Sequence, residues 1–257
     1  MVKVAAYQAP FVEGSLKESI ALIAEQVRSC ESAGVEILCC PEGILGGLAD
    51  YAARPSDIAI ESQQLQRMLA PLASSSVATI LGFTELGHDG HLFNTAALVY
   101  QGVVNGLYRK RYPAINRSVY TPGDNLPVFR IGQLTFGVVI CRDSTYPEPI
   151  RHMVNRGATV LFVPTNNGLP PERFGPEVVE EARQTDTARA RENGIWVIRS
   201  DVAGRTKSLV SYGSSNIVNP SGIVVRGAKP FEVSLLIAEI ETKENRSNQT
   251  LQLSSRA

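Results

Sequence analysis

Short runs of β-branched residues alternate with amphipathic helical stretches along nearly the whole chain, and few architectures accommodate that order. The runs predict strands at 2–9, 35–42, 77–86, 92–100, 103–110, 159–165 and 195–203. Ser15, with Glu18 three residues later, predicts the start of a helix that Gly34 ends. Further helices are expected near 60–74, from about 148, and over 177–193. This alternation is typical of stacked βαβ units.

Three turn signals join strands directly rather than through a helix. They are Gln101-Gly102, Gly132-Gln133 and Pro220-Ser221-Gly222. Hairpins among βαβ units indicate mixed sheets, so we expect an α/β fold in which two mixed β-sheets pack face to face with helices outside. No repeat, linker or low-complexity tract divides the sequence, and a single domain over 1–257 is predicted.

Composition narrows the class of partner. The 25 basic residues balance 25 acidic ones, so no overall charge attracts nucleic acid or a membrane surface, and a small-molecule partner is favoured. No apolar run reaches the roughly 18 residues of a membrane span. Four cysteines without an export signal are typical of reduced thiols, which predicts a cytoplasmic location; they are Cys30, Cys39, Cys40 and Cys141.

Three predicted strands end in reactive side chains, which are Glu42, Lys110 and Cys141. Because ligands of such sheets gather beyond strand ends, these groups are expected to converge in one cleft. Each residue also has a plainer interpretation. A strand-end Glu or Lys is commonly solvated, and a Cys that follows an apolar run is commonly packed in the core. The residues alone leave both interpretations open.

Other common catalytic motifs are missing from the sequence. It contains no G-x-S-x-G elbow, and no G-x-G-x-x-G loop follows a strand. His88 and His91 flank a glycine-containing turn without further ligands nearby, and His152 is expected on a helix. We therefore predict neither a metal nor a cofactor.

Three ordered motifs resemble those of the nitrilase, or carbon–nitrogen hydrolase, superfamily. They are PEG (41–43), YRKRYP (108–113) with TPGD (121–124) behind it, and CRDSTYPEP (141–149). The similarity extends over nearly the whole chain. It implies an αββα sandwich, a homodimer or higher homo-oligomer, and a Glu–Lys–Cys site. By position, Glu42 is the expected base, Lys110 its electrostatic partner and Cys141 the nucleophile.

These residue types suit hydrolysis of a small amide. A carboxylate takes the thiol proton as the sulfur attacks, and a lysine with the backbone N–H of Arg142 stabilises the oxyanion. Release of ammonia or an amine leaves a thioester that water hydrolyses. We expect a hydrolase of a non-peptide C–N bond. The alternatives are a carbamoyl-amide hydrolase of the same fold and a non-catalytic ligand-binding member.

One residue of this chain differs from the pattern of the family that it resembles. Many family members carry a second glutamate where this chain has Asn116. Asparagine cannot accept a proton at neutral pH, so Asn116 is interpreted either as a substrate-positioning residue or as an ordinary loop residue. Asn166 and Asn167, which follow another strand, are candidate substrate contacts with the same plainer alternative.

Overall fold

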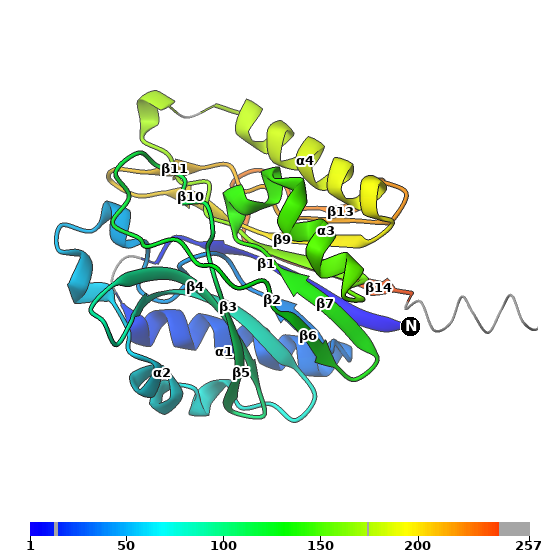
Figure 1. The fold of residues 1–257 in the computed structure, drawn as a ribbon, viewed down its shortest axis with the longest axis horizontal. Coiled ribbons are helices and arrows are strands. Elements are labelled where there is room, and N and C mark those ends of the chain that lie inside the picture. The colour runs from blue at the N-terminus through cyan, green and yellow to red at the C-terminus, as the bar shows by residue number, and fades with distance from the viewer. Residues whose placement is uncertain (13–14, 174, 242–257) are drawn as a thin grey trace, which may run out of the picture.

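The protein is a four-layered α/β sandwich. The computed structural model describes residues 1–12, 15–173 and 175–241, so the last part of the predicted domain, 242–257, lies outside the described residues. Two β-sheets pack face to face, with α1 (Leu16–Ala33) and α2 (Ser62–Met68) outside one sheet and α3 (Pro147–Asn155) and α4 (Glu177–Asn193) outside the other (Figure 1). This arrangement confirms the predicted αββα sandwich.

The first sheet has eight strands, in the order β11-β10-β1-β2-β3-β4-β5, with β14 also paired to β1. Its members are β1 (Val2–Pro10), β2 (Ile37–Cys39), β3 (Ala78–Leu86), β4 (Leu92–Tyr100), β5 (Val103–Arg109), β10 (Val202–Arg205), β11 (Val210–Ser211) and β14 (Ser234–Ile240). β1, β2 and β3 are parallel, whereas β4 and β5 continue as an antiparallel meander. The sheet is mixed, as the hairpin signals predicted.

The second sheet has six strands in the order β13-β12-β9-β8-β7-β6. They are β6 (Val128–Ile131), β7 (Leu134–Val138), β8 (Val160–Pro164), β9 (Trp196–Ser200), β12 (Asn216–Val218) and β13 (Val224–Gly227). β7, β8 and β9 are parallel, and antiparallel strands flank them on both sides. Parallel strands buried on both faces explain the continuous apolar runs in the sequence.

Helix α1 begins and ends where its flanking residues predicted. The Ser15 hydroxyl accepts a hydrogen bond from the Glu18 N–H at 3.2 Å, and Gly34 closes the helix in the left-handed conformation. Ile23 and Val27, on one face of α1, pack with Tyr7 and Leu38 of the first sheet. Five short 3-10 helices join the larger elements: η1 (Ala49–Tyr51), η2 (Pro55–Ile58), η3 (Ala70–Leu72), η4 (Cys141–Thr145) and η5 (Pro171–Arg173).

Two hydrophobic cores hold the layers together. One fills the space between the sheets and beneath α3, where Ile80 of β3 and Phe136 of β7 are buried in one cluster with Met153 of α3. The other lies between the first sheet and α1. In β1, Val4 and Ala6 belong to the first cluster, and the intervening Ala5 belongs to the second. This alternation is the period of two expected for a strand buried on both faces.

Three predicted elements differ from the observed ones. β2 covers only part of 35–42, and the predicted helix over 60–74 is α2 followed by η3, because Pro71 cannot continue the hydrogen bonding of an α-helix. The predicted strand 195–203 was wrong as one element: β9 and β10 belong to different sheets. Asp201 separates them, and its carboxylate accepts the N–H of Val202 at 2.8 Å in place of a strand partner.

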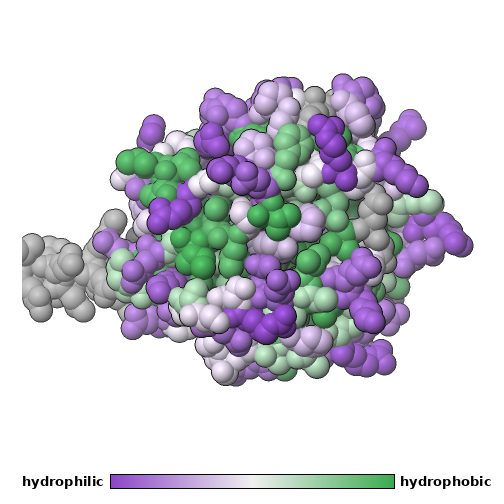
Figure 2. Space-filling model, turned by 180° about the vertical axis from the view of Figure 1, so that it is seen from behind, coloured by the Kyte–Doolittle hydropathy of each residue, from purple (hydrophilic) through white to green (hydrophobic). Residues whose placement is uncertain are grey.

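The surface carries apolar patches between charged residues (Figure 2). The exposed large apolar side chains are Met1, Tyr51, Val103, Val119, Ile223, Phe231 and Val233. Within the described residues, no helix has both the length and the hydropathy needed to cross a bilayer. The predicted homo-oligomer has no test in a single chain and stays a prediction.

Gly82 of β3 lets the backbone that carries Glu42 lie directly against the first sheet. A Cβ atom at this position would meet the Glu42 Cα and the Pro41 carbonyl oxygen, both at 2.7 Å. These are backbone atoms that cannot rotate away, so the contact leaves no room for a side chain.

Gly82→Ala is therefore expected to destabilise the protein by about 1–3 kcal/mol through overpacking. Thermal unfolding followed by circular dichroism measures this as a fall in Tm of several degrees. Gly227→Ala is the matched control, since the nearest atom to its added Cβ is Val224 Cγ1 at 3.8 Å. Equal Tm values for the two variants would contradict the packing argument.

Candidate active site

Glu42 and Lys110 form a buried ion pair at the strand ends. Glu42 follows β2 and Lys110 follows β5, and their side chains are 2% and 4% exposed. The Lys110 ammonium donates to Glu42 Oε1 at 2.6 Å, and Asn94 Nδ2 donates to the same oxygen at 2.7 Å. The backbone N–H of Asn166 donates to Glu42 Oε2 at 2.9 Å. Donors from three separate segments therefore orient one carboxylate.

The backbone holds Cys141 in an uncommon conformation. Cys141 opens η4 with a φ of 46°, in the left-handed region that costs a non-glycine residue about 1 kcal/mol or more. The Ser144 hydroxyl donates to the Cys141 carbonyl at 2.8 Å, and the Asp143 N–H donates to Ile140 O at 2.9 Å. The buried apolar run that ends at Ile140 anchors this turn. Of the four cysteines, Cys141 is half-buried, whereas the other three are buried.

Asn167 makes the polar contact to the Cys141 thiol. The thiol donates to Asn167 Oδ1 at 3.8 Å, a weak sulfur hydrogen bond. Asn167 Nδ2 donates to Asp201 Oδ2 at 3.1 Å and to Ser214 Oγ at 3.0 Å. These two bonds orient the amide so that its oxygen faces the sulfur. Asp201, which divides β9 from β10, thereby positions the group beside the thiol.

Burial and neighbouring charges set the protonation of the site. Burial raises the pKa of the Cys141 thiol to about 12, and the charge of Glu42 adds to the rise, while Lys110 opposes it. Burial by itself would lower the pKa of Lys110, but the charge of Glu42 holds it above the usual lysine value. The resting site thus contains a neutral thiol beside a charged carboxylate and a charged ammonium.

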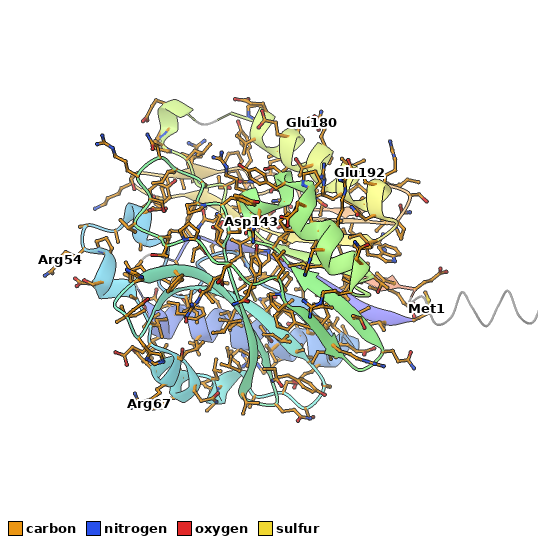
Figure 3. All side chains as sticks on the ribbon, viewed as in Figure 1. Met1, Arg54, Arg67, Asp143, Glu180 and Glu192 are labelled. Atoms are coloured by element: carbon orange, nitrogen blue, oxygen red, sulfur yellow. The ribbon has the colours of Figure 1, made fainter. Side chains whose placement is uncertain are left out.

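Asp143 links the Lys110 segment to the Cys141 turn, and it lies near the middle of the molecule (Figure 3). Its buried carboxylate accepts the Tyr108 hydroxyl at 2.6 Å and the Tyr112 N–H at 2.8 Å. Both tyrosines flank Lys110 in sequence, so Asp143 links the segment of Lys110 to the turn of Cys141.

A second buried ion pair, between Arg199 and Asp186, contacts residues next to the site. Arg199 of β9 binds Asp186 of α4 through two hydrogen bonds of 2.6 and 2.7 Å. The same guanidinium donates to Ser144 Oγ at 3.0 Å and to Thr165 Oγ1 at 2.7 Å. Arg199 therefore braces the turn of Cys141 and the segment that precedes Asn166. In the sequence, the feature that could have indicated this buried ion pair is an arginine inside an otherwise apolar predicted strand.

The remaining predicted residues occupy different places. Asn166 lies at the pocket wall, and its Oδ1 accepts the Gly168 N–H at 3.0 Å. The exposed Arg142 side chain donates to Ala114 O at 2.9 Å, which ties down the loop that follows Lys110. Asn116 is exposed on that loop and is not among the residues that line the pocket, although residues 113–115 just before it are. The structure thus brings Asn166 and Asn167 to the site and leaves Asn116 outside it.

Glu42, Lys110 and Cys141 line one narrow pocket of about 30 Å³. Asn94, Tyr120 and the loop residues 113–115 complete its walls. Sequence reasoning missed Asn94, whose Oδ1 is buried without a hydrogen-bond partner among the described residues. Within those residues, no group of three or more His, Cys, Asp or Glu side chains has the arrangement of a metal site.

A family model that matches nearly the whole chain shows which family the protein belongs to. Residues 3–247 match the family model described as carbon-nitrogen hydrolase, and the protein belongs to the carbon–nitrogen hydrolase family.

Several characterised relatives are similar in sequence. The chain is 28% identical to the glutamine-dependent NAD(+) synthetase of Thermotoga maritima over 91% of its own length and 40% of the synthetase. It is 32% identical to an (R)-stereoselective amidase of a Pseudomonas species, over 77% of the chain and 70% of the amidase. Identity to the N-carbamoylputrescine amidase of Oryza sativa is 29%, over 66% of the chain and 61% of that enzyme. The chain spans less than half the length of the synthetase.

Solved structures show the same fold. A carbon-nitrogen hydrolase from Helicobacter pylori superposes with a TM-score of 0.85 at 21% identity, covering 99% of this chain and 94% of that one. An amidase from Nesterenkonia superposes with a TM-score of 0.78 at 24% identity, over 97% of this chain and 100% of that one. The latter is a variant in which acrylamide has undergone Michael addition at the active site cysteine.

The raised pKa of Cys141 makes its alkylation rate depend on pH. Because the pKa lies near 12, the thiolate fraction rises about tenfold per pH unit between pH 7 and 10. The rate of iodoacetamide labelling at Cys141, measured by peptide mass spectrometry, should rise in step without levelling off near pH 9. Free cysteine is the control and levels off above pH 8.5 or so. A plateau for Cys141 near pH 8 would contradict this environment.

Proposed function

We propose that the protein hydrolyses a small-molecule amide through a Cys141 thioester, with Glu42 as general base and acid and Lys110 as electrostatic partner. The observation that carries this proposal is the common pocket of the three side chains, in which a buried carboxylate and ammonium lie 2.6 Å apart beside a half-buried thiol. Thiol, base and cation are the groups that amide hydrolysis by a cysteine needs.

In the first step, Glu42 takes the thiol proton while Sγ bonds to the substrate carbonyl carbon. A thiol with a pKa near 12 needs this help, because it is almost fully protonated at neutral pH. Among the hydrogen bonds of the described residues, Glu42 Oε2 accepts one, from Asn166, which leaves acceptor capacity for the proton. A positioned base of this kind contributes about 10²–10⁴-fold to the rate.

The carbonyl oxygen becomes an oxyanion that the Lys110 ammonium and the N–H of Arg142 stabilise. The C–N bond then breaks, Glu42 returns the proton to the departing amine, and a thioester remains on Cys141. A water molecule then gives a proton to Glu42 while its oxygen adds to the thioester carbon. The C–S bond breaks, the acid is released, and Glu42 returns the proton to Sγ. Asn94 Oδ1, buried without a partner among the described residues, supplies an acceptor for the substrate amide N–H.

The relatives support this reaction class and leave the substrate open. One acts as an (R)-stereoselective amidase, one on N-carbamoylputrescine, and one uses glutamine within a longer synthetase. A carbamoyl amide would pass through the same steps, so it is retained as the alternative substrate class. The homo-oligomeric state, the cytoplasmic location and the lack of a nucleic-acid partner stay predictions.

Intact-protein mass spectrometry tests the proposal directly. The purified protein is mixed with propionamide and quenched within milliseconds to seconds, and Cys141→Ala and Glu42→Gln are treated in the same way. We expect a propionyl adduct on the wild type alone, and a loss of hydrolysis of about 100-fold or more in Glu42→Gln. Turnover retained by Cys141→Ala would exclude the thioester. A wild type that binds amides without turnover would establish the non-catalytic alternative.

Two further variants test residues that do not line the pocket. Asn116→Glu should retain amide hydrolysis within about threefold, because Asn116 is exposed and does not line the pocket. His152→Ala should do the same, since a Glu–Lys–Cys site uses no histidine. Steady-state kcat/KM for both variants provides the measurement, and total loss in either one would place a missing catalytic group there.

A further inference from the structure

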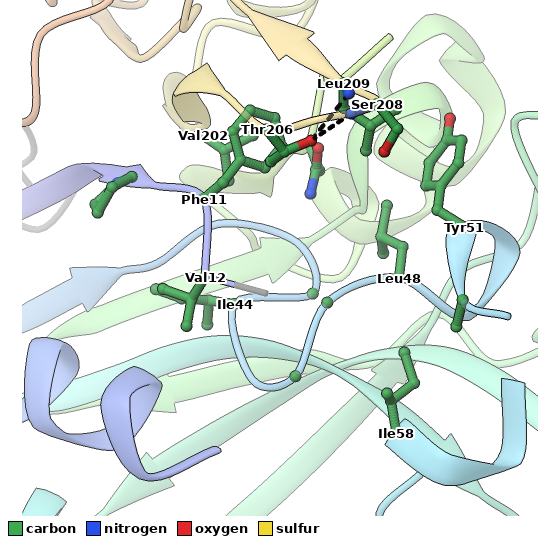
Figure 4. Close-up of a pocket in the computed structure, with 16 residues that line it drawn as sticks. Phe11, Val12, Ile44, Leu48, Tyr51, Ile58, Val202, Thr206, Ser208 and Leu209 are labelled. Atoms are coloured by element: carbon green, nitrogen blue, oxygen red, sulfur yellow. Dashed lines mark hydrogen bonds between the residues drawn. The ribbon is translucent and has the colours of Figure 1, made fainter. Parts of the chain in front are cut away.

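A larger cavity adjoins the narrow pocket of Cys141. It measures about 400 Å³ and lies between the segment after β1, the loop after Glu42 and the β10–β11 turn (Figure 4). Its size falls in the range of small-molecule sites. The catalytic scheme above does not use it, because a reacting amide group needs only the narrow pocket.

The two cavities share walls. Leu48, Tyr51 and Asn166 line both of them, so the larger cavity is the space adjacent to an amide group that reaches Cys141. Asn166 is also the residue whose N–H holds the catalytic carboxylate. The larger cavity is therefore positioned as the site for the substituent of the scissile amide.

The lining of the larger cavity is mainly apolar, with polar side chains from Tyr51, Asn166, Thr206 and Ser208, and it contains no charged side chain among the described residues. Apolar side chains surround it from several segments, namely Phe11, Val12, Ile44, Leu48, Ile58 and Leu209 (Figure 4). Thr206 also lines it, but its hydroxyl oxygen already accepts the N–H groups of Ser208 and Leu209 at 3.2 and 2.9 Å. An ionised substituent would lose water there without gaining a counter-charge.

We propose that this cavity selects amides with an uncharged, apolar substituent and disfavours substrates that carry an ammonium or carboxylate on it. The inference rests on the proposed amide hydrolysis and adds the substrate class. Glutamine and N-carbamoylputrescine, the substrates in the names of two relatives, both carry ionised groups at neutral pH. The same fold would thus serve a different substrate class in this chain.

Asp50 is a second carboxylate, besides Glu42, that lines the narrow pocket. Its oxygens accept the Ser118 hydroxyl at 2.9 and 3.0 Å and the Val119 N–H at 2.8 Å. It fastens the 118–120 segment to η1. Asp50 therefore serves as a structural acceptor, and it lines the narrow pocket and not the larger cavity.

A matched series of amides tests the proposal by steady-state kinetics on the full chain. The series consists of propionamide, hexanamide, 6-aminohexanamide and adipamic acid, which differ in length or in terminal charge. Each buried methylene is worth about fourfold in kcat/KM, so hexanamide should exceed propionamide by about 50-fold. It should exceed each charged analogue by at least about 100-fold, because their ionised ends lose hydration in the cavity.

Leu209→Glu places a carboxylate in the cavity wall at a half-buried position. The kcat/KM ratio of hexanamide to 6-aminohexanamide should fall by about 100-fold in this variant. Ile58→Glu places a carboxylate in the opposite wall of the same cavity. This variant is used for the test if Leu209→Glu does not fold. Ile223→Glu is the control, since Ile223 is 60% exposed and lies outside both cavities, and it should leave the ratio unchanged.

The outcomes separate the two proposals. A wild type that hydrolyses propionamide but treats the three longer amides alike, or prefers a charged one, overturns the cavity inference and leaves the proposed reaction standing. A wild type that forms no Cys141 adduct with any of the four overturns the proposed reaction, and the inference with it. Equal ratios in Leu209→Glu and Ile223→Glu would also overturn the assignment of this cavity.

Discussion

The buried ion pair between Glu42 and Lys110 is the interaction on which the rest of the site depends. Two charges removed from water are stable only with close partners, and removing one partner of such a pair typically costs about 3–5 kcal/mol. The fold supplies the partners by ending β2 and β5 at the same edge of the first sheet and by adding donors from Asn94 and Asn166. The second sheet then brings Cys141 to this pair. Its neutral thiol, with a pKa near 12, follows from that crowded and dry surrounding.

A layer of buried polar residues keeps the three groups in register. Asp143 ties the tyrosines around Lys110 to the Cys141 turn, Arg199 ties that turn to α4, and Asp201 orients Asn167 against the sulfur. Each of these residues is buried and hydrogen-bonded, as polar groups in a protein interior must be. The strain at Cys141, with its φ of 46°, persists because these contacts determine the turn from several sides. The arrangement of Glu42, Lys110 and Cys141 thus depends on both sheets and on one helix.

Much of this arrangement could be predicted from the sequence, and the limits have physical causes. Alternating apolar periodicities indicated the strands, and the turn pairs indicated which strands were hairpins. Glu42, Lys110 and Cys141 could be singled out because each ends a predicted strand. Asn94 could not, because it lies inside β4 and contacts Glu42 across 52 residues of sequence. Asp201 was hidden in an apparently continuous strand, and only the pairing of β9 and β10 with different sheets reveals the break. The exposure of Asn116 depends on a loop whose path no periodicity determines.

Glu42, Lys110 and Cys141, distant in sequence, share one electrostatic environment. The most direct test is the second-order rate constant of iodoacetamide with Cys141 at pH 8, compared among wild type, Glu42→Gln and Lys110→Met. Glu42 raises the thiol pKa and Lys110 lowers it, so Glu42→Gln should react faster than wild type and Lys110→Met more slowly. A general loosening of the structure would accelerate both variants together. Rates that move in the same direction, or that do not change, would contradict the account whatever the substrate proves to be.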